Sequence, residues 1–220
     1  MRSLIPFLFL GLAALPALAK PPGVDLARGN GKIPTVLVLG DSLSAGYGLR
    51  RSDAYPALLS AKAEASGQRL RIVNAGVNGD TTAGGLRRLP GLLDQRVDVL
   101  VIELGINDAF RGVPVALIES NLQKMIELAR ARHPQVRIVL AGMQLPHYSG
   151  GDYLNAFGAI YADLARRNGV QLVPFLLEGV AGNPALNLPD FIHPNAAGQK
   201  VLAANVWPIL QTALKKNNQS

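Results

Sequence analysis

The sequence contains no cysteine among its 220 residues. This absence excludes disulfide scaffolds, cysteine-ligated zinc and iron–sulfur sites, and a thiol nucleophile, so any covalent catalysis must use an oxygen nucleophile. Charged residues make up only 17% of the chain and hydrophobic residues 49%, a balance too apolar for a disordered protein. A chain of this length and composition can bury a substantial core, and we expect one folded domain.

Aromatic residues are also scarce, at 5% of the chain, although the formal net charge is +7. The basic residues are scattered along the chain in pairs, with few aromatics between them. Nucleic-acid-binding surfaces usually combine clustered basic residues with aromatics that stack on bases. We therefore expect a solvated basic surface, no nucleic-acid partner, and at most transient contact with a membrane surface. The sequence predicts no particular oligomeric state.

The first 19 residues have the pattern of a cleavable secretory signal peptide. Arg2 supplies the positive start, residues 4–15 are apolar, and Ala-Leu-Ala at residues 17–19 is a cleavage site before Lys20. The apolar stretch is broken by proline and glycine and is shorter than the roughly 20 residues of a membrane-spanning helix, which disfavours an uncleaved anchor. Cleavage removes Arg2 and lowers the net charge of +7 by one. We expect a periplasmic or secreted protein without a lipid anchor.

After the predicted signal peptide, the sequence predicts a short lead-in and one domain that contains five strands. Residues 20–32, rich in Pro and Gly, predict a flexible lead-in, and residues 33–216 predict a single domain. Five short runs rich in apolar and β-branched residues predict strands, and the first has no polar gap, as expected for a strand buried on both faces of a parallel sheet. The runs are residues 35–39, 70–73, 97–104, 136–141 and 171–173.

Helical periodicity lies between and after the later strands. Apolar residues repeat at spacings of three and four over residues 118–129 and 154–164, and residues 195–214 predict a C-terminal helix with a bend near Pro208. Strands separated by helix-length connections predict an α/β fold, a three-layer α/β/α sandwich on a flavodoxin-like, parallel five-stranded sheet. Ligands bind outside the carboxyl ends of such strands. Candidate sites therefore lie after the first three strands and before the last helix.

The segment after the first strand, residues 40–48, holds the candidate nucleophile Ser42. A turn of small residues from a buried strand into a helix-like segment exposes a side chain next to the positive end of a helix. The alternatives are a helix cap and a glycine-rich phosphate loop. The glycine spacing of dinucleotide and P-loop motifs is absent, which disfavours the phosphate loop, whereas a serine cap stays open.

Two further segments offer hydrogen-bond donors. Gly79 lies in residues 74–82, after the second strand, where its backbone amide could donate to an oxyanion. Asn107 follows the third strand, and its side-chain amide could donate into the same space. The alternatives are an ordinary turn in which Asp80 or Thr81 caps the next helix, and an Asx-turn at Asn107.

Asp190 and His193 lie three residues apart in the segment before the last predicted helix. A carboxylate at this spacing can turn back onto Nδ1, fix the tautomer and stabilise the imidazolium, which leaves the other ring nitrogen to take a proton from a serine. His133 and His147 are interpreted as structural. Three widely separated histidines and scattered carboxylates lack metal-ligand spacing, so no metal site is expected.

In this order and placement, the four segments resemble the sequence blocks of the SGNH hydrolases, also called GDSL esterases and lipases. The matching residues are Gly-Asp-Ser-Leu-Ser at 40–44, Gly79, Gly-Ile-Asn-Asp at 105–108, and Asp-Phe-Ile-His-Pro at 190–194. They span roughly 155 residues, which makes the resemblance specific. Segments 44–48, 79–82 and 173–175 extend it to the periplasmic branch of arylesterases, acyl-CoA thioesterases and lysophospholipases. Ile106 departs from the pattern, because many relatives have Gly there.

The resemblance implies a catalytic triad and an oxyanion hole. Ser42 would attack an acyl carbonyl, His193 would transfer the proton, and Asp190 would orient His193. The oxyanion hole would consist of the amides of Ser42 and Gly79 and the side chain of Asn107. No metal and no organic cofactor is implied.

The resemblance also implies supporting features of the site. Asp41 and Asp108 are expected to hold turns. The strained Gly-x-Ser-x-Gly elbow of α/β-hydrolases is absent, which favours an open site with broad specificity. Loops 110–114, 144–152 and 177–189 are expected to form its rim. The apolar residues of these loops and their ends either suit an acyl chain or pack beneath them; they include Leu145, Leu176, Leu186 and Leu188.

The expected function is hydrolysis of carboxylic esters and thioesters through an acyl-enzyme, with a small-molecule or lipid-like ester as substrate. One alternative keeps the mechanism but acts as an O-acetylesterase on envelope or secreted polysaccharide. A second alternative is a non-catalytic carbohydrate- or lipid-binding module, which is disfavoured because every position of the triad is filled. The sequence does not predict the acyl-chain length or the leaving group.

Overall fold

The structure is a computed structural model that describes residues 33–145 and 151–215. The predicted signal peptide, the predicted lead-in and His147 lie outside the described residues, as does most of the predicted rim loop 144–152. Within the described ranges, no helix combines the length and the apolar character that crossing a membrane requires.

Five parallel strands form one sheet, in the order β2-β1-β3-β4-β5. Their bounds are β1 Thr35–Gly40, β2 Arg71–Gly76, β3 Val99–Glu103, β4 Arg137–Ala141 and β5 Gln171–Val173. All five predicted strands are present, and this order is that of flavodoxin. The predicted α/β class and sheet are therefore confirmed.

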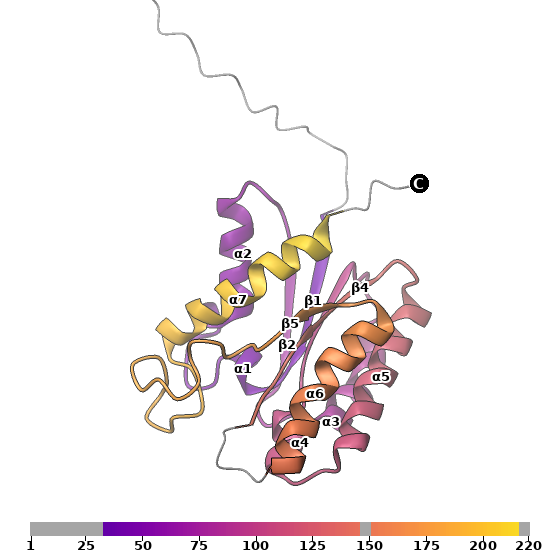
Figure 1. Ribbon diagram of the computed structural model, residues 1–220. Coiled ribbons are helices and arrows are strands. Elements are labelled where there is room, and N and C mark those ends of the chain that lie inside the picture. Colours follow the sequence, from indigo (N-terminus) through magenta and orange to yellow (C-terminus); the bar gives the residue numbers. More distant parts are fainter. Residues whose placement is uncertain (1–32, 146–150, 216–220) are drawn as a thin grey trace, which may run out of the picture. The chain divides into compact units, whose positions relative to one another are not determined.

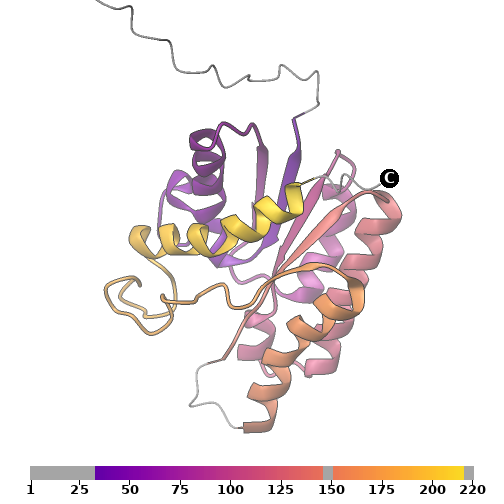
Figure 2. The same ribbon diagram turned by 45° about the horizontal axis from the view of Figure 1, so that its top comes forward.

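Helices cover both faces of the sheet, and Figures 1 and 2 show the three layers. Helices α2 and α7 lie on one face, and α3, α5 and α6 lie on the other. The longer helices are α2 Tyr55–Ala65, α3 Thr82–Leu92, α5 Val115–Arg132, α6 Gly151–Asn168 and α7 Ala196–Leu214. Two short helices, α1 Ser42–Ala45 and α4 Ile106–Phe110, begin just after β1 and β3, and a 3₁₀ turn covers Arg51–Asp53.

The core lies between the sheet and the helices on each face. Every residue of β1 is buried, as the gap-free apolar run predicts for a central parallel strand. In α5, Ile118, Leu122 and Met125 are fully buried, so the helical spacing does place one face against the sheet. Burying such a side chain contributes about 1.5–3 kcal/mol, and this burial fixes the positions of the strand ends.

The structure differs from the sequence expectation in three elements, β2, α2 and α3. Strand β2 continues through Gly76, three residues beyond the predicted end, because the Asn74 side chain is satisfied within the fold: Nδ2 donates to the Ser44 carbonyl at 2.7 Å and Oδ1 accepts from the Gly76 amide at 2.9 Å. Periodicity also did not locate α2 and α3. Helix α3 buries Gly84 and Gly85 beside Leu89, and a Cβ on Gly85 would clash with the Leu104 side chain, so glycines make up part of its buried face.

The strand order reverses direction between β1 and β3, because the chain moves outward to β2 on one side and to β4 and β5 on the other. Ligands bind at this switch point in open α/β sheets, since the loops that leave the two neighbouring strands diverge there. Helices α1 and α4 begin at this point, directly after β1 and β3. The fold therefore places the segments of Ser42 and Asn107 side by side.

Candidate active site

The segment after β1 turns directly into α1, and Asp41 is the residue that caps this helix. Its Oδ1 accepts a hydrogen bond from the Leu43 amide at 3.0 Å. Ser42 is the first helical residue and is 8% exposed, so its hydroxyl is not the cap. The first amide of a helix has no partner within the helix. Both the hydroxyl and the amide of Ser42 are thus left for other partners.

Ser42, His193 and Asp190 are brought together by the fold. The Ser42 Oγ lies 3.1 Å from His193 Nε2, although the two residues are 151 positions apart. His193 Nδ1 lies 2.7 Å from Asp190 Oδ2. A hydrogen-bonded chain of hydroxyl, imidazole and carboxylate is the arrangement that allows a serine to lose its proton as it attacks.

Asp190 is held in its ionised form by hydrogen bonds from its own loop. The backbone N–H of His193 contributes most, followed by the His193 ring and the backbone N–H of Ile192, and together they lower the pKa of Asp190 to about 2. Both backbone donors lie 3.0 Å from Asp190 Oδ1. The carboxylate therefore stays available to orient the ring and to stabilise an imidazolium near neutral pH.

The histidine loop, residues 188–195, is closed by its own backbone. The Leu188 amide donates to the His193 carbonyl at 2.7 Å, and the Phe191 amide donates to the Leu188 carbonyl at 2.9 Å. Phe191 has a φ of 59°, which is costly for a bulky residue and occurs mostly where surrounding structure enforces it. The Tyr47 ring lies against the His193 ring, with centroids 4.3 Å apart.

The two other predicted donors approach from β2 and β3. Gly79 has a φ of +71° in a turn that the Asp80 amide closes on the Val77 carbonyl at 3.1 Å. Its carbonyl accepts a hydrogen bond from Arg111 at 3.0 Å, which fixes the orientation of that peptide. Asn107 donates one N–H of its side chain to Asp41 Oδ2 at 2.9 Å. An amide carries a second N–H, which remains for a ligand.

The residues expected to hold turns make the contacts of such residues. Asp108 is buried and accepts from the Thr82 amide at 2.8 Å and from the Thr82 hydroxyl at 2.6 Å, which joins α4 to the start of α3. Thr81 is the cap of α3, since its hydroxyl accepts from the Gly84 amide at 3.1 Å. His133 Nε2 lies 2.9 Å from the Leu93 carbonyl, away from the predicted triad residues, in agreement with a structural role.

Exposed apolar side chains gather on the segments that carry the predicted site residues. Tyr47 lies shortly after α1, Val77 directly follows β2, and Phe110 ends α4. Two more, Phe191 and Ile192, lie between Asp190 and His193. Leu145 and Leu176, by contrast, are buried beneath the loops. Phe110 lies in the predicted rim loop 110–114, whereas the other four exposed residues were not assigned to the rim, because no periodicity marks them.

Three further residues of the site had no predicted role: Tyr47, Arg111 and Glu103. Tyr47 and Arg111 lie in or next to the matching blocks, but nothing in the sequence shows which atoms they contact. Glu103 is the last residue of β3 and is fully buried. A glutamate that ends an apolar strand is the one signal that could have marked it, because an unpaired buried charge is costly.

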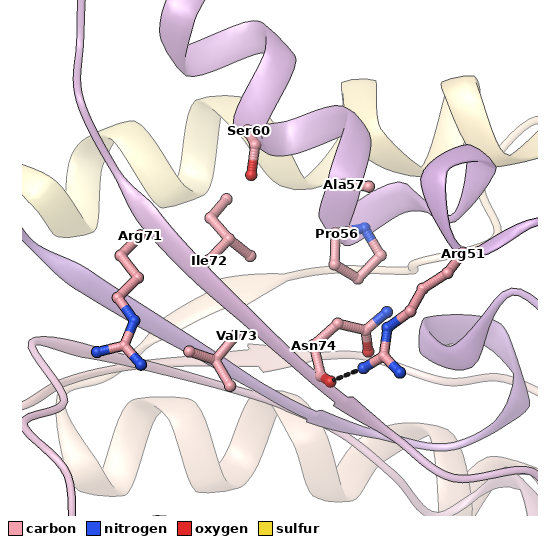
Figure 3. Close-up of a pocket in the computed structure, with 8 residues that line it drawn as sticks. All are labelled: Arg51, Pro56, Ala57, Ser60, Arg71, Ile72, Val73 and Asn74. Atoms are coloured by element: carbon pink, nitrogen blue, oxygen red, sulfur yellow. Dashed lines mark hydrogen bonds between the residues drawn. The ribbon is translucent and has the colours of Figure 1, made fainter.

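A hollow of about 450 Å³ lies on the outer edge of the sheet, between β2 and α2 (Figure 3). Arg51 and Arg71 flank it, and Arg51 donates to the Asn74 carbonyl at 2.6 Å. None of the residues predicted to act in catalysis lines this hollow. The candidate active site therefore lies at the carboxyl ends of the strands, where Ser42, His193 and Asp190 meet, and not at this hollow.

Within residues 33–145 and 151–215, no three His, Asp or Glu side chains are grouped so that they could hold a metal ion. The described residues therefore offer the site a serine, an imidazole, a carboxylate and amide donors. These groups are sufficient for acyl transfer through a covalent serine intermediate.

Comparison with known proteins agrees with this geometry. Residues 38–201 match the GDSL-like Lipase/Acylhydrolase family. The chain is 44% identical over 181 residues to Esterase TesA of Pseudomonas aeruginosa, which covers 82% of this chain and 89% of that protein. It is 38% identical over 200 residues to Thioesterase 1/protease 1/lysophospholipase L1 of Escherichia coli, covering 90% of this chain and 88% of that protein.

The solved structures agree as well. The crystal structure of TesA superposes with a TM-score of 0.78 and 44% identity, over 82% of this chain and 99% of that one. The matched residues 38–201 include every residue predicted for the triad and the oxyanion hole. The chain therefore belongs to the GDSL-like lipase/acylhydrolase family, the SGNH hydrolases, and is a carboxylic ester hydrolase.

Proposed function

We propose that Ser42, His193 and Asp190 are the catalytic triad of this hydrolase. One observation carries the proposal: the Ser42 hydroxyl lies 3.1 Å from His193, whose other nitrogen lies 2.7 Å from Asp190. Ser42 Oγ attacks the acyl carbonyl while His193 Nε2 takes its proton. His193 then delivers this proton to the leaving group, and water, activated by the same nitrogen, releases the acid from the acyl-enzyme.

The negative charge that develops on the substrate oxygen is received by three N–H donors: the amides of Ser42 and Gly79 and the side chain of Asn107. Ser42 contributes the unused first amide of α1, Gly79 is oriented by its turn and by Arg111, and Asn107 keeps a second N–H beside the one bound to Asp41. A single donor of this kind contributes about 2.7–4 kcal/mol to transition-state stabilisation in measured cases.

Within the ester class, the substrates that the site fits best are aryl esters, thioesters and lysophospholipids. The exposed apolar residues around the histidine loop and α4 offer contact area to an acyl chain, whereas a site for an acetylated polysaccharide would present polar side chains to the sugar. The relatives named an esterase and a thioesterase/lysophospholipase support the same choice.

We further propose that the protein is exported to the periplasm or secreted after cleavage near Ala19, and that it binds no nucleic acid. The pattern of residues 1–19 supports export, and the scattered basic residues argue against a nucleic-acid surface. Fractionation of cells that express the full chain, with the N-terminal sequence of the product determined, tests the first part. A product that retains residues 1–19 contradicts it.

The triad is tested by Ser42→Ala, with Ser60→Ala as the matched control. Ser60 lines the edge hollow and none of the predicted site residues does, so its change should leave turnover intact. With a short-chain aryl ester, Ser42→Ala should lower kcat at least about a thousandfold, because loss of the nucleophile removes the acyl-enzyme route. The same assay over a series of acyl lengths, on ester, thioester and lysophospholipid, ranks the substrates. Turnover in Ser42→Ala equal to that in Ser60→Ala would refute the mechanism.

A further inference from the structure

Glu103 lies directly beneath the Ser42 turn. It ends β3 and stands opposite Gly40, the last residue of β1, in the register of the two strands. A Cβ on Gly40 would lie 2.5 Å from Glu103 Oε2 and 2.1 Å from Ser44 Oγ. The carboxyl group therefore occupies the space that the missing side chain of Gly40 leaves.

One oxygen of Glu103 holds the turn on both sides of the nucleophile. Oε2 accepts from the amide of Asp41 at 3.2 Å, from the amide of Ser44 at 3.2 Å and from the hydroxyl of Ser44 at 2.5 Å. Asp41 and Ser44 are the residues before and shortly after Ser42. The position of the Ser42 backbone thus depends on an acceptor supplied by another strand.

The other oxygen, Oε1, is buried and has no donor among the described residues. The neighbouring polar side chain is Asp41, also fully buried, whose backbone amide is bound by Glu103 Oε2. No salt bridge in residues 33–145 and 151–215 reaches either carboxyl. Two neighbouring buried carboxyl groups, with no salt bridge to either, favour a state in which one of them keeps a proton.

Of the two carboxyl groups, that of Glu103 is the more favourable site for the proton. Burial, and then the charge of Asp41, raise the pKa of Glu103 well above its usual value, whereas burial raises the pKa of Asp41 to about 6. Asp41 also accepts N–H bonds from Leu43 and Asn107, which favour its ionised form. A carboxylic acid that points its O–H at a carboxylate satisfies both Oε1 and Asp41.

We propose that Glu103 is a positioning residue for ester hydrolysis: as a neutral carboxylic acid it donates a hydrogen bond from Oε1 to the Asp41 carboxylate, while Oε2 holds the backbone on both sides of Ser42. Through Asp41 the same contact fixes Asn107, so one buried proton aligns the nucleophile with an oxyanion donor. The inference rests on the catalytic role proposed for Ser42 and on the donor role proposed for Asn107.

The neutral state also serves the electrostatics of the reaction. An ionised Glu103 would place a second negative charge beneath the point where the substrate oxygen becomes negative, and that charge would oppose the transition state. The other polar groups around the pair do not replace the proton. Tyr55 of α2 bonds Ser44 at 2.9 Å, Tyr161 of α6 bonds the Leu104 carbonyl at 2.9 Å, and Arg88 of α3 binds the Gly40 carbonyl at 2.9 Å.

The first test compares Glu103→Gln with Glu103→Leu and Glu103→Asp. Glutamine keeps a neutral donor and an acceptor, so kcat should fall only about threefold, because this variant leaves the hydrogen-bond pattern in place. Leucine removes both contacts and aspartate withdraws the carboxyl, so kcat should fall about a hundredfold in each, with KM little changed, as expected when a reacting group is misplaced by about 1 Å. Thermal melting identifies the variants that fold.

The second test measures the proton itself. If Glu103 is neutral, Glu103→Gln leaves the charge beside His193 unchanged, and the acidic limb of the kcat/KM profile keeps its position on the pH axis. If Glu103 is ionised, the variant removes a negative charge that stabilises the imidazolium, and the limb moves to lower pH. The infrared difference spectrum at pH 7 should also contain the carbonyl stretch of a protonated carboxylic acid that Glu103→Gln lacks.

Three results would overturn the proposal: a shift of the acidic limb in Glu103→Gln, absence of the protonated carbonyl band, or a folded Glu103→Leu as active as Glu103→Gln. If Glu103→Leu does not fold, Glu103→Asp and the two measurements on Glu103→Gln still decide the question. Failure of the proposed function is distinguishable, because turnover that survives Ser42→Ala refutes that function and leaves the infrared result intact.

Discussion

The nucleophile turn, residues 40–46, and the histidine loop, residues 188–195, meet at one hydrogen bond but are held in place by opposite means. The turn is held by buried side chains, its own Asp41 and Ser44 and Glu103 of β3, all inaccessible to solvent. The loop is largely held by its own backbone and by Asp190, and its Phe191 is 64% exposed. The proposed nucleophile is thus supported by a side chain of another strand in the core, whereas the proposed proton carrier is supported within its own loop at the surface.

The largest effect on turnover is expected in the histidine loop, where Asp190 accepts a hydrogen bond from the His193 ring. In Asp190→Asn the amide cannot both accept from His193 Nδ1 and stabilise an imidazolium, so kcat should fall about 10³–10⁴-fold while the fold is kept. Steady-state kinetics with an aryl ester measure the loss, and a melting curve that keeps a cooperative transition shows that the variant is folded. Asp163→Asn, a change in an exposed pair on α6, is the control. An active Asp190→Asn enzyme would mean that this loop does not orient the base.

The opposite response is expected from the turn, where a change should first affect folding. In Gly40→Ala the new Cβ would overlap Ser44 Oγ and Glu103 Oε2, both buried and fixed. Overpacking of this kind costs about 1–3 kcal/mol of unfolding free energy. Gly158→Ala on α6 is the matched control, because no atom lies within 4 Å of its new Cβ, and it should gain up to about 1 kcal/mol from helix propensity. Urea denaturation compares the two variants, and equal stabilities would show that the turn is not tightly packed.

The smallest effect concerns the pH dependence of stability, which has opposite signs in the two regions. The raised pKa of Asp41, about 6 against 3.8, means that the folded state binds this proton more tightly, so its contribution to stability is lost as pH rises from about 4 to 6. Asp190, with its pKa lowered to about 2, contributes stability above pH 3.8 that is lost as pH falls towards 2.

Melting temperatures between pH 4 and 7 isolate the contribution of Asp41, because that of Asp190 changes only at lower pH. The decline due to Asp41 should be on the order of 1 kcal/mol, since one pKa unit corresponds to about 1.4 kcal/mol and the opposing carboxyls offset part of it. Asp41→Asn should flatten the decline and Asp53→Asn, at an exposed ion pair, should not. A wild-type curve that rises through this range, with no change in Asp41→Asn, would contradict a buried titrating pair.

The two regions also differ in how far the sequence predicted them. The apolar runs located all five strands, and the mark on composition is clearest for β1 and β3, which are buried throughout. The contact within the histidine loop could also be predicted, since Asp190 and His193 are close in the sequence and their contact needs only a tight turn. The four matching blocks then indicated which distant segments meet.

The support of the turn could not be predicted in the same way. Glu103 acts on Ser44 across 59 residues, and only the strand register places it opposite Gly40. Asn74 looked like the start of a loop because its polar side chain interrupts an apolar run, and its partner, the Ser44 carbonyl, is set by tertiary structure. The exposed apolar residues at the rim follow from loop conformation, which periodicity does not describe.

The arginines at the outer edge of β2 have a consequence for the behaviour of the chain in concentrated solution. An unpaired edge strand offers its backbone as a template for another molecule, and bulky charged side chains at such an edge disfavour that pairing. Arg51 already occupies the Asn74 carbonyl, and Arg71 stands at the start of the strand. At the β2 edge of the sheet, the two arginines therefore disfavour pairing with a strand of another molecule.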